Sequence, residues 1–183
     1  MIHIALLQKT ELKDGSKISV GQLKEVFLKC GFTGVRVVLT GGNVIFYSKN
    51  KTTIELRIIC EEALRKAFGT DIKVVVFSDF EYVAMHEHAA KLKWWNVGDD
   101  KKHNAFFAVP PANGQTVLDE LGALNKDLET VSLYNKRVIF WSAPSKSAGR
   151  GKFMKALKGS IGKSLITRKS EIFVKLTECL MQK

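Results

Sequence analysis

The residues between Thr130 and Ser170 could bind an anion, because this segment contains Lys and Arg but no Asp or Glu. The formal net charge of the whole chain is +11, so the segment alone carries nearly that charge and the remainder is close to neutral. A one-sided positive field attracts polyanions, although many basic proteins carry such charge only as a solubilising surface. The cations of the segment are Lys136, Arg137, Lys146, Arg150, Lys152, Lys155, Lys158, Lys163, Arg168 and Lys169.

Within this segment, Gly149-Arg150-Gly151-Lys152 leads into a predicted helix over residues 151–157. At about 100° per residue, Phe153 and Leu157 share one arc of that helix and the lysines occupy the opposite arc. Free N–H groups at a helix N-terminus also favour anions. We therefore predict an anion-binding or nucleic-acid-binding surface, with a purely solvated lysine face as the alternative. Its candidate residues are Arg150, Lys152, Lys155, Lys158, Lys163, Arg168 and Lys169.

Other motifs that could carry chemistry are incomplete. His86 and His88 are two residues apart, so on a helix they point to different sides and cannot chelate one metal ion. Gly162-Lys163-Ser164 is similar to the end of a phosphate-binding P-loop, but the first glycine of that motif would fall at Leu157. The cysteines Cys30, Cys60 and Cys179 lack metal-site spacing. The sequence thus predicts no metal, no cofactor and no catalytic residue, and favours a non-enzymatic protein.

Trp94 and Trp95 precede the polar segment 98–103 and allow two interpretations. Both side chains could cover the core between two halves of the chain. Alternatively one of them is exposed and stacks on a base or a partner protein. Trp94 and Trp95 are therefore possible partner contacts.

The elements that must position these residues follow one order twice. Apolar periodicity, capping boxes at Ser19 and Ser78, and turn residues mark the boundaries. Gly41-Gly42-Asn43 separates two apolar runs, which predicts a hairpin with Gly42 and Asn43 in a tight turn and strands covered on both faces. In the first half we expect strands over 2–7, 35–39, 44–47 and 72–77, a helix over 20–29, and a second helix that is capped by Thr52 or Thr53 and ends just before Gly69. In the second half we expect strands over 104–109, 128–134, 137–141 and 164–167 and helices over 115–121, 151–157 and 170–181.

The order β-α-β-β-α-β is that of a ferredoxin-like unit. The predicted fold class is α+β, with two ferredoxin-like (α/β-plait) units packed together and a C-terminal helix. We expect the first unit over residues 1–78, a connecting helix and Trp-Trp segment over 79–100, and the second unit with the basic segment over 101–183. Apolar strands suggest covered sheets, which disfavours reading of RNA on an open sheet face.

Several short segments, taken in order, resemble the bacterial DUF1697 family of unknown function. They are Ala5-Leu6-Leu7, 41–46, Trp94-Trp95, 138–141 and Ile166-Thr167-Arg168, and they span almost the whole chain. The resemblance implies two α/β-plait units and a bacterial cytoplasm, and it supplies no activity. The chain departs from the family at Gln8-Lys9-Thr10, where relatives carry an Arg-Gly-Ile-Asn-Val-Gly-Gly loop, and at Lys169, where relatives commonly carry Asn after the Arg.

The most direct functional expectation is a non-enzymatic protein that binds a polyanion, with nucleic acid held through its phosphates as the first candidate. The alternatives are an enzyme or sensor for a small phosphorylated ligand held near Arg150, Lys152 and Arg168, and a protein-interaction module. The chain shows no signal peptide, no apolar run long enough to span a membrane, and an odd number of cysteines, which together indicate the cytoplasm. The sequence gives no oligomeric state.

Overall fold

The computed structural model of the protein describes residues 1–39 and 41–182. The chain divides into two compact units, which we call unit 1 (residues 1–83 and 175–183) and unit 2 (residues 84–174). Both divisions fall inside helices, one in α3 (Asp79–Ala90) and one in α7 (Ser170–Met181). Each of these helices therefore contributes one end to each unit.

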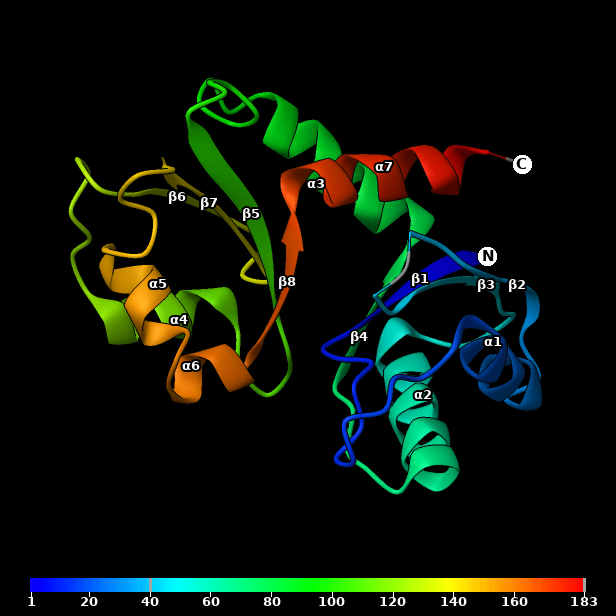
Figure 1. Cartoon of the computed structure of the whole chain (residues 1–183). Helices are drawn as coiled ribbons and strands as arrows, with labels where there is room; N and C mark the ends of the chain where they lie inside the picture. Colours follow the sequence, from blue (N-terminus) through cyan, green and yellow to red (C-terminus); the bar gives the residue numbers. More distant parts are fainter. Residues whose placement is uncertain (40, 183) are drawn as a thin grey trace. The chain divides into compact units, whose positions relative to one another are not determined.

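Unit 1 is built on a four-stranded antiparallel sheet in the order β2-β3-β1-β4. Helices α1 and α2 contact the same face of this sheet (Figure 1). The chain order β-α-β-β-α-β and this strand order are those of a ferredoxin-like unit. The elements are β1 (Ile2–Leu7), α1 (Val20–Lys29), β2 (Thr33–Val37), β3 (Asn43–Tyr47), α2 (Thr53–Phe68) and β4 (Val74–Ser78).

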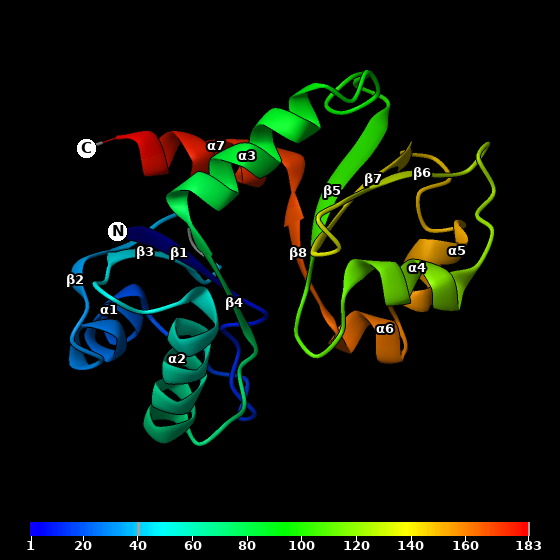
Figure 2. The ribbon, with the colours of Figure 1, turned by 180° about the vertical axis from the view of Figure 1, so that it is seen from behind.

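Unit 2 repeats the arrangement with a sheet in the order β6-β7-β5-β8. Helices α4, α5 and α6 lie together on one face of it, as both views of the ribbon show (Figures 1 and 2). The short helix α6 has no counterpart in unit 1 and was not predicted. The elements are β5 (Lys101–Ala108), α4 (Gly114–Leu121), β6 (Thr130–Tyr134), β7 (Val138–Pro144), α5 (Lys152–Ala156), α6 (Ser160–Lys163) and β8 (Leu165–Lys169).

Local side-chain chemistry sets the helix boundaries. The Ser19 side chain accepts from the Gln22 amide and the Gln22 side chain accepts from the Ser19 amide, so a complete capping box opens α1. Thr52 and Glu55 do the same for α2, which ends at Gly69 in a left-handed conformation. These three boundaries agree with the sequence prediction.

The two predicted hairpins differ in their detail. Asn135 and Lys136 form the turn between β6 and β7 with φ of +46° and +55°, as an Asn-containing hairpin turn requires. The β2–β3 connection is longer than the tight turn that was expected, because β2 ends at Val37 and Asn43 already belongs to β3. Gly42 has the predicted positive φ, +83°. Thr40 lies outside the described residues.

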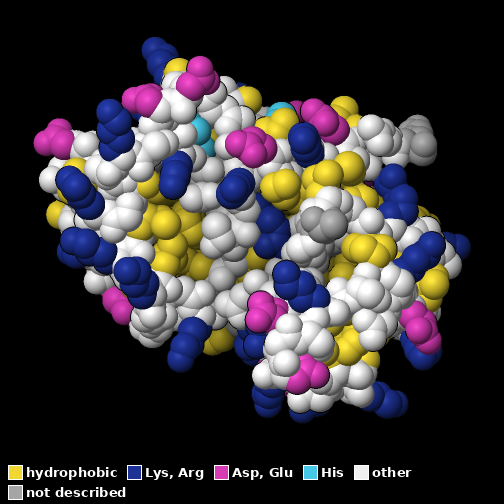
Figure 3. Space-filling view, in the orientation of Figure 1, with side chains coloured by type: hydrophobic (Ala, Val, Ile, Leu, Met, Phe, Trp, Pro, Cys, Tyr) yellow, Lys and Arg dark blue, Asp and Glu magenta, His cyan; other side chains and the backbone are white. Residues whose placement is uncertain are grey.

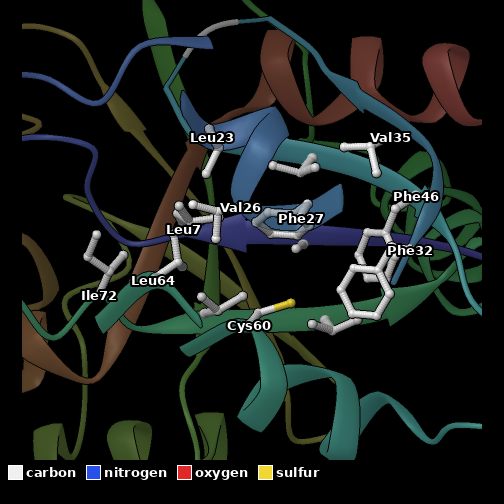
Figure 4. Packing of buried hydrophobic residues seen from close by; sticks show 14 of the residues in the cluster. Leu7, Leu23, Val26, Phe27, Phe32, Val35, Phe46, Cys60, Leu64 and Ile72 are labelled. Carbon is white, nitrogen blue, oxygen red and sulfur yellow. The ribbon is translucent and has the colours of Figure 1, made fainter. Parts of the chain in front are cut away.

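The core of unit 1 fills the space between its sheet and helices α1 and α2 (Figure 4). Phe27, Phe32 and Phe46 pack together there, with ring centroids 4.3 to 6.1 Å apart. The opposite sheet face is buried as well, since Ile4, Leu6 and Phe77 are at most 1% exposed. Tyr82 of α3 packs edge-on against Phe77 and covers part of that face. Of the two hairpin strands that were predicted to be covered on both faces, β3 is buried at Asn43 to Phe46, but the edge strand β2 is buried only at Val35.

Unit 2 is also apolar on both sheet faces. Phe106, Trp141 and Phe153 fill the side of α4, α5 and α6. On the other side, Phe173 of α7 packs against Phe107 and Phe140. The predicted α+β fold with two four-stranded antiparallel sheets and a C-terminal helix is confirmed. Within the described chain, no helix combines the length and apolar character that crossing a membrane needs.

Candidate anion-binding surface

A buried carboxylate, Glu129, organises the basic region of unit 2. Glu129 is only 2% exposed. Its Oε2 accepts from the Trp141 indole Nε1 at 3.0 Å and its Oε1 accepts from the Phe153 amide at 3.0 Å. Both donors satisfy a charge that would be costly to bury alone. Glu129 was not among the predicted site residues, because it stands one position before the acid-free segment and no local pattern marks it as buried.

The Glu129 carboxylate binds at the N-terminus of α5, the position at which the sequence predicted an anion from solution. The N-cap residue Gly151 makes no side-chain capping bond, and the carboxylate binds the Phe153 amide in its place. A Cβ at Gly151 would collide with Glu129 Oε2, so the close approach requires glycine here. Because the protein supplies its own anion to this five-residue helix, we assign no ligand to the helix terminus.

The surface cations that remain are on α5 and the segments beside it. Arg150, Lys155 and Lys158 are exposed, and none of the three forms an ion pair within the described part of the chain. Lys163 and Lys169 are exposed too. We call Arg150, Lys155 and Lys158 the basic ridge. Their charges are available to a ligand from solution.

Lys152 is exposed and lies near the C-terminus of α4. Its Nζ lies 3.8 Å from the position that a Cβ on Gly122 would take, and Gly122 is the C-cap residue of α4. Cations are stabilising at a helix C-terminus, where unpaired carbonyl groups gather. Lys152 therefore places a positive charge near the end of α4, so we leave it out of the binding test.

Arg168 does not extend the basic ridge, which corrects the sequence-based prediction. Alternate residues of a strand point to opposite faces. Leu165 of β8 packs in the core beside α5 and α6, so Arg168, three positions later, faces the other side of the sheet. The side chain is 9% exposed, and its Nη1 donates to the Thr167 carbonyl oxygen at 2.8 Å.

Apolar side chains lie among the cations. In Figure 3 the side of unit 2 that carries α5 shows a yellow apolar area with dark-blue Lys and Arg around it. Half-buried side chains of α5 and its neighbours that pack on the core include Leu124, Met154 and Leu157. The cations thus stand around an apolar area that is continuous with the core of unit 2.

The structure separates the two tryptophans. Trp95 is 6% exposed and packs edge-on against His103, Phe140 and Phe173, so it belongs to the core and is not available to a partner in the folded protein. Trp94 is half-buried and stacks edge-on against Trp95.

The two histidines of α3, His86 and His88, are half-buried. His86 packs against Phe173, and His88 packs against Tyr134 with ring centroids 4.6 Å apart. His88 Nε2 also lies 3.4 Å from the Ser132 hydroxyl oxygen. Burial lowers the pKa of His88, with the charge of Lys91 adding to the effect. Among the residues that the structure describes, no three His, Cys, Asp or Glu side chains gather as metal ligands.

Comparisons with known proteins agree with this architecture. The sequence profile of the family described as "Protein of unknown function (DUF1697)" matches residues 1–140. The chain belongs to the DUF1697 family. The conserved bacterial protein SP0830 from Streptococcus pneumoniae has a similar solved structure, with a TM-score of 0.81 and 17% sequence identity over 100% of this chain and 99% of that one. No curated protein matches the sequence. The DUF1697 match and the structural likeness support the fold, and the surface must be interpreted from its own chemistry.

Proposed function

We propose that this DUF1697 protein is a non-enzymatic, cytoplasmic binding protein for nucleic acid, which it holds through the phosphates. The observation that carries the proposal is the basic ridge of Arg150, Lys155 and Lys158, whose charges have no acidic partner within the described chain. Glu129, the acid that binds the first turn of α5, is buried and hydrogen-bonded on both oxygens. Its charge is directed into the protein, and the outer surface stays positive.

The chemistry of the ridge favours affinity over sequence recognition. Lysine contacts to phosphate position a nucleic acid without reading its bases. Each neutralised phosphate releases condensed counterions, so binding should weaken steeply as salt rises. A small phosphorylated ligand held jointly by Arg150, Lys152 and Arg168 fits less well, because Arg168 faces the opposite side of the sheet.

The test is fluorescence anisotropy with a mixed-sequence oligonucleotide at two salt concentrations. The ridge variant combines Arg150→Glu, Lys155→Glu and Lys158→Glu and lowers the net charge by six, from +11 to +5. The control variant combines Lys13→Glu, Lys24→Glu and Lys66→Glu, which are exposed residues of unit 1, and has the same net charge. This pair separates the position of the charge from its total.

We expect wild type and control to bind, with log K falling against log salt at a slope of roughly −3 or steeper if three or more phosphates are engaged. The ridge variant should lose binding while keeping its fold, since exposed charge changes usually cost little stability. No binding by the wild type at low salt would refute the proposal. Equal loss in both variants would show that only total charge matters.

A further inference from the structure

Strand β6 forms one edge of the unit 2 sheet, where a further strand could pair (Figures 1 and 2). Among the residues that the structure describes, β6 pairs with β7 alone. Its five residues include no charged residue, proline or glycine, and their pairing with β7 runs without a bulge. Four of the five are half-buried, whereas β7 next to them is buried from Val138 to Ala143. An edge of this kind readily accepts another strand.

The equivalent edge strand of unit 1, β2, is protected. Its pairing with β3 shifts register between Thr33 and Arg36, and Gly34 between them has a positive φ of +60°. Arg36 also donates from Nη2 to the Cys179 carbonyl oxygen at 3.0 Å, which holds the end of α7 beside the strand. Bulges, charges and covering segments are the usual means by which proteins block pairing at an edge. Within the described chain β6 has none of these, so its edge indicates a partner.

The direction of the backbone groups in β6 follows from its neighbours. The carbonyl oxygen of Arg137, just before β7, accepts from the Ala108 amide of β5 at 2.8 Å. In an antiparallel ladder the backbone groups of successive residues point to opposite neighbours, so those of Val138 point to β6. Val138 pairs with the last residue of β6, and alternation along β6 then turns the N–H and C=O groups of Leu133 and Val131 outward. The edge therefore presents two donors and two acceptors.

Strand β6 is complementary to a second copy of itself. When two such strands run antiparallel with Ser132 at the centre, each Val131 lies opposite the Leu133 of the other copy, and all the outward groups find partners. Val131 and Leu133 already pack on the core of unit 2, so their side chains extend that core from one copy to the next. Asp127 before the strand and Lys136 after it are both exposed. Antiparallel pairing brings these opposite charges to the same end of the junction.

We propose that two copies of this protein associate through β6, so that their unit 2 sheets form one continuous antiparallel sheet. The pairing is symmetric, because each copy contributes the same strand. Two strands of five residues bury less surface than the roughly 1,600 Å² of a standard stable interface, so the dimer is weak and reversible. This association uses the sheet edge and does not depend on the basic ridge or on nucleic-acid binding.

Sedimentation velocity of the full chain, from micromolar to millimolar concentration, tests the dimer. The weight-average mass of the wild type should rise from 20.5 kDa toward twice that value. Val131→Pro removes an outward N–H and places the proline ring in the path of the partner's carbonyl group, while the bonds to β7 remain. This variant should stay at the mass of one chain. The control Val131→Thr keeps the N–H and should dimerise, and far-UV circular dichroism checks that both variants are folded.

A cross-link tests the register independently of the proline variant. Ser132→Cys places a thiol opposite its own copy, close enough for a disulfide, whereas Thr130→Cys places it opposite Tyr134 of the other copy. After mild oxidation Ser132→Cys should give a covalent dimer and Thr130→Cys should not, with the wild type as the background for the native cysteines.

Two kinds of result would overturn the proposal. A wild type that stays monomeric at millimolar concentration leaves the edge of β6 to a strand of another protein. A dimer that persists in folded Val131→Pro, or equal cross-linking of the two thiol variants, places the contact on another surface. The ridge variant should dimerise as the wild type does, so failure of nucleic-acid binding and failure of the dimer are distinguishable.

Discussion

Glu129 is the single residue on which the form of the basic region depends. Its two oxygens join β7, through Trp141, to the first turn of α5, through Phe153. The connection from β7 to α5 therefore begins and ends at residues that are fixed from inside the protein. A buried carboxylate therefore fixes the start of the helix that carries Lys155.

Glu129→Gln should lower the free energy of unfolding by about 1–3 kcal/mol, because the amide NH₂ cannot accept from both donors and leaves one buried N–H unpaired. Urea denaturation followed by far-UV circular dichroism measures the change. Asp127→Asn is the matched control, since Asp127 is exposed. Similar stability in the two variants would contradict the structural role of Glu129.

His3 should make the stability of the protein depend on pH below neutrality. Burial lowers its pKa in the folded state from 6.5, so the unfolded chain binds a proton more readily and stability falls as the pH drops below about 6.5. His3→Phe removes this loss, because phenylalanine does not titrate, and it keeps an aromatic ring against Phe46. The free energy of unfolding of the variant, relative to that of the wild type, should therefore be higher at pH 5.5 than at pH 8. An advantage that shrinks on acidification would show that the pKa of His3 is raised.

At the scale of elements, short polar signals predicted the architecture well. Ser19 with Gln22, and Thr52 with Gly69, fixed helix boundaries because each cap acts within a few residues of its own position. The turn at Asn135 was predictable for the same reason. The sequence could not predict α6, because a single turn is too short to show a helical period. It could not predict on which side of the sheet Arg168 lies, because that depends on how β8 pairs with β5. The burial of Glu129 depends on contacts with residues 12 and 24 positions away.

The β2–β3 connection allows a test of close packing between elements. Gly41 and Gly42 have nearly equal φ, +80° and +83°, but only a Cβ at Gly42 would crowd β1, at 2.9 Å from Leu7 Cβ. Gly41→Ala should cost about 1 kcal/mol through backbone strain, and Gly42→Ala should cost more, by about another 1–3 kcal/mol from overpacking. Thermal and urea unfolding of the two variants compare these costs. Equal destabilisation would show that β1 does not limit the position.

At the scale of the whole molecule, the shared helices predict how the protein unfolds. Because the division between the units falls inside α3 and inside α7, unfolding of one unit alone would have to end within two helices. All three tryptophans, Trp94, Trp95 and Trp141, lie in unit 2, so their fluorescence reports that unit alone. We expect one cooperative transition, with coincident midpoints by tryptophan fluorescence and far-UV circular dichroism.

A core substitution in unit 1 provides the decisive comparison. Leu23 is 2% exposed and packs in the core of that unit. Leu23→Ala should lower the midpoint of unfolding measured by tryptophan fluorescence, although the tryptophans lie in the other unit. The midpoint measured by circular dichroism should fall by the same amount. A fluorescence transition that stays in place would show that the units unfold independently.

The contact between Glu129 and Gly151 also has a consequence for how relatives of this protein can diverge. A larger residue at position 151 requires that Glu129 be replaced first. Replacement of Glu129 in turn requires another group that accepts hydrogen bonds from Phe153 and Trp141. Neither position can change first without loss of stability, so the two are expected to change together or not at all. Gly149, two residues earlier, has no neighbour within 4 Å of a Cβ and is under no such constraint. Among relatives, positions 129 and 151 should therefore change together, whereas position 149 should vary freely.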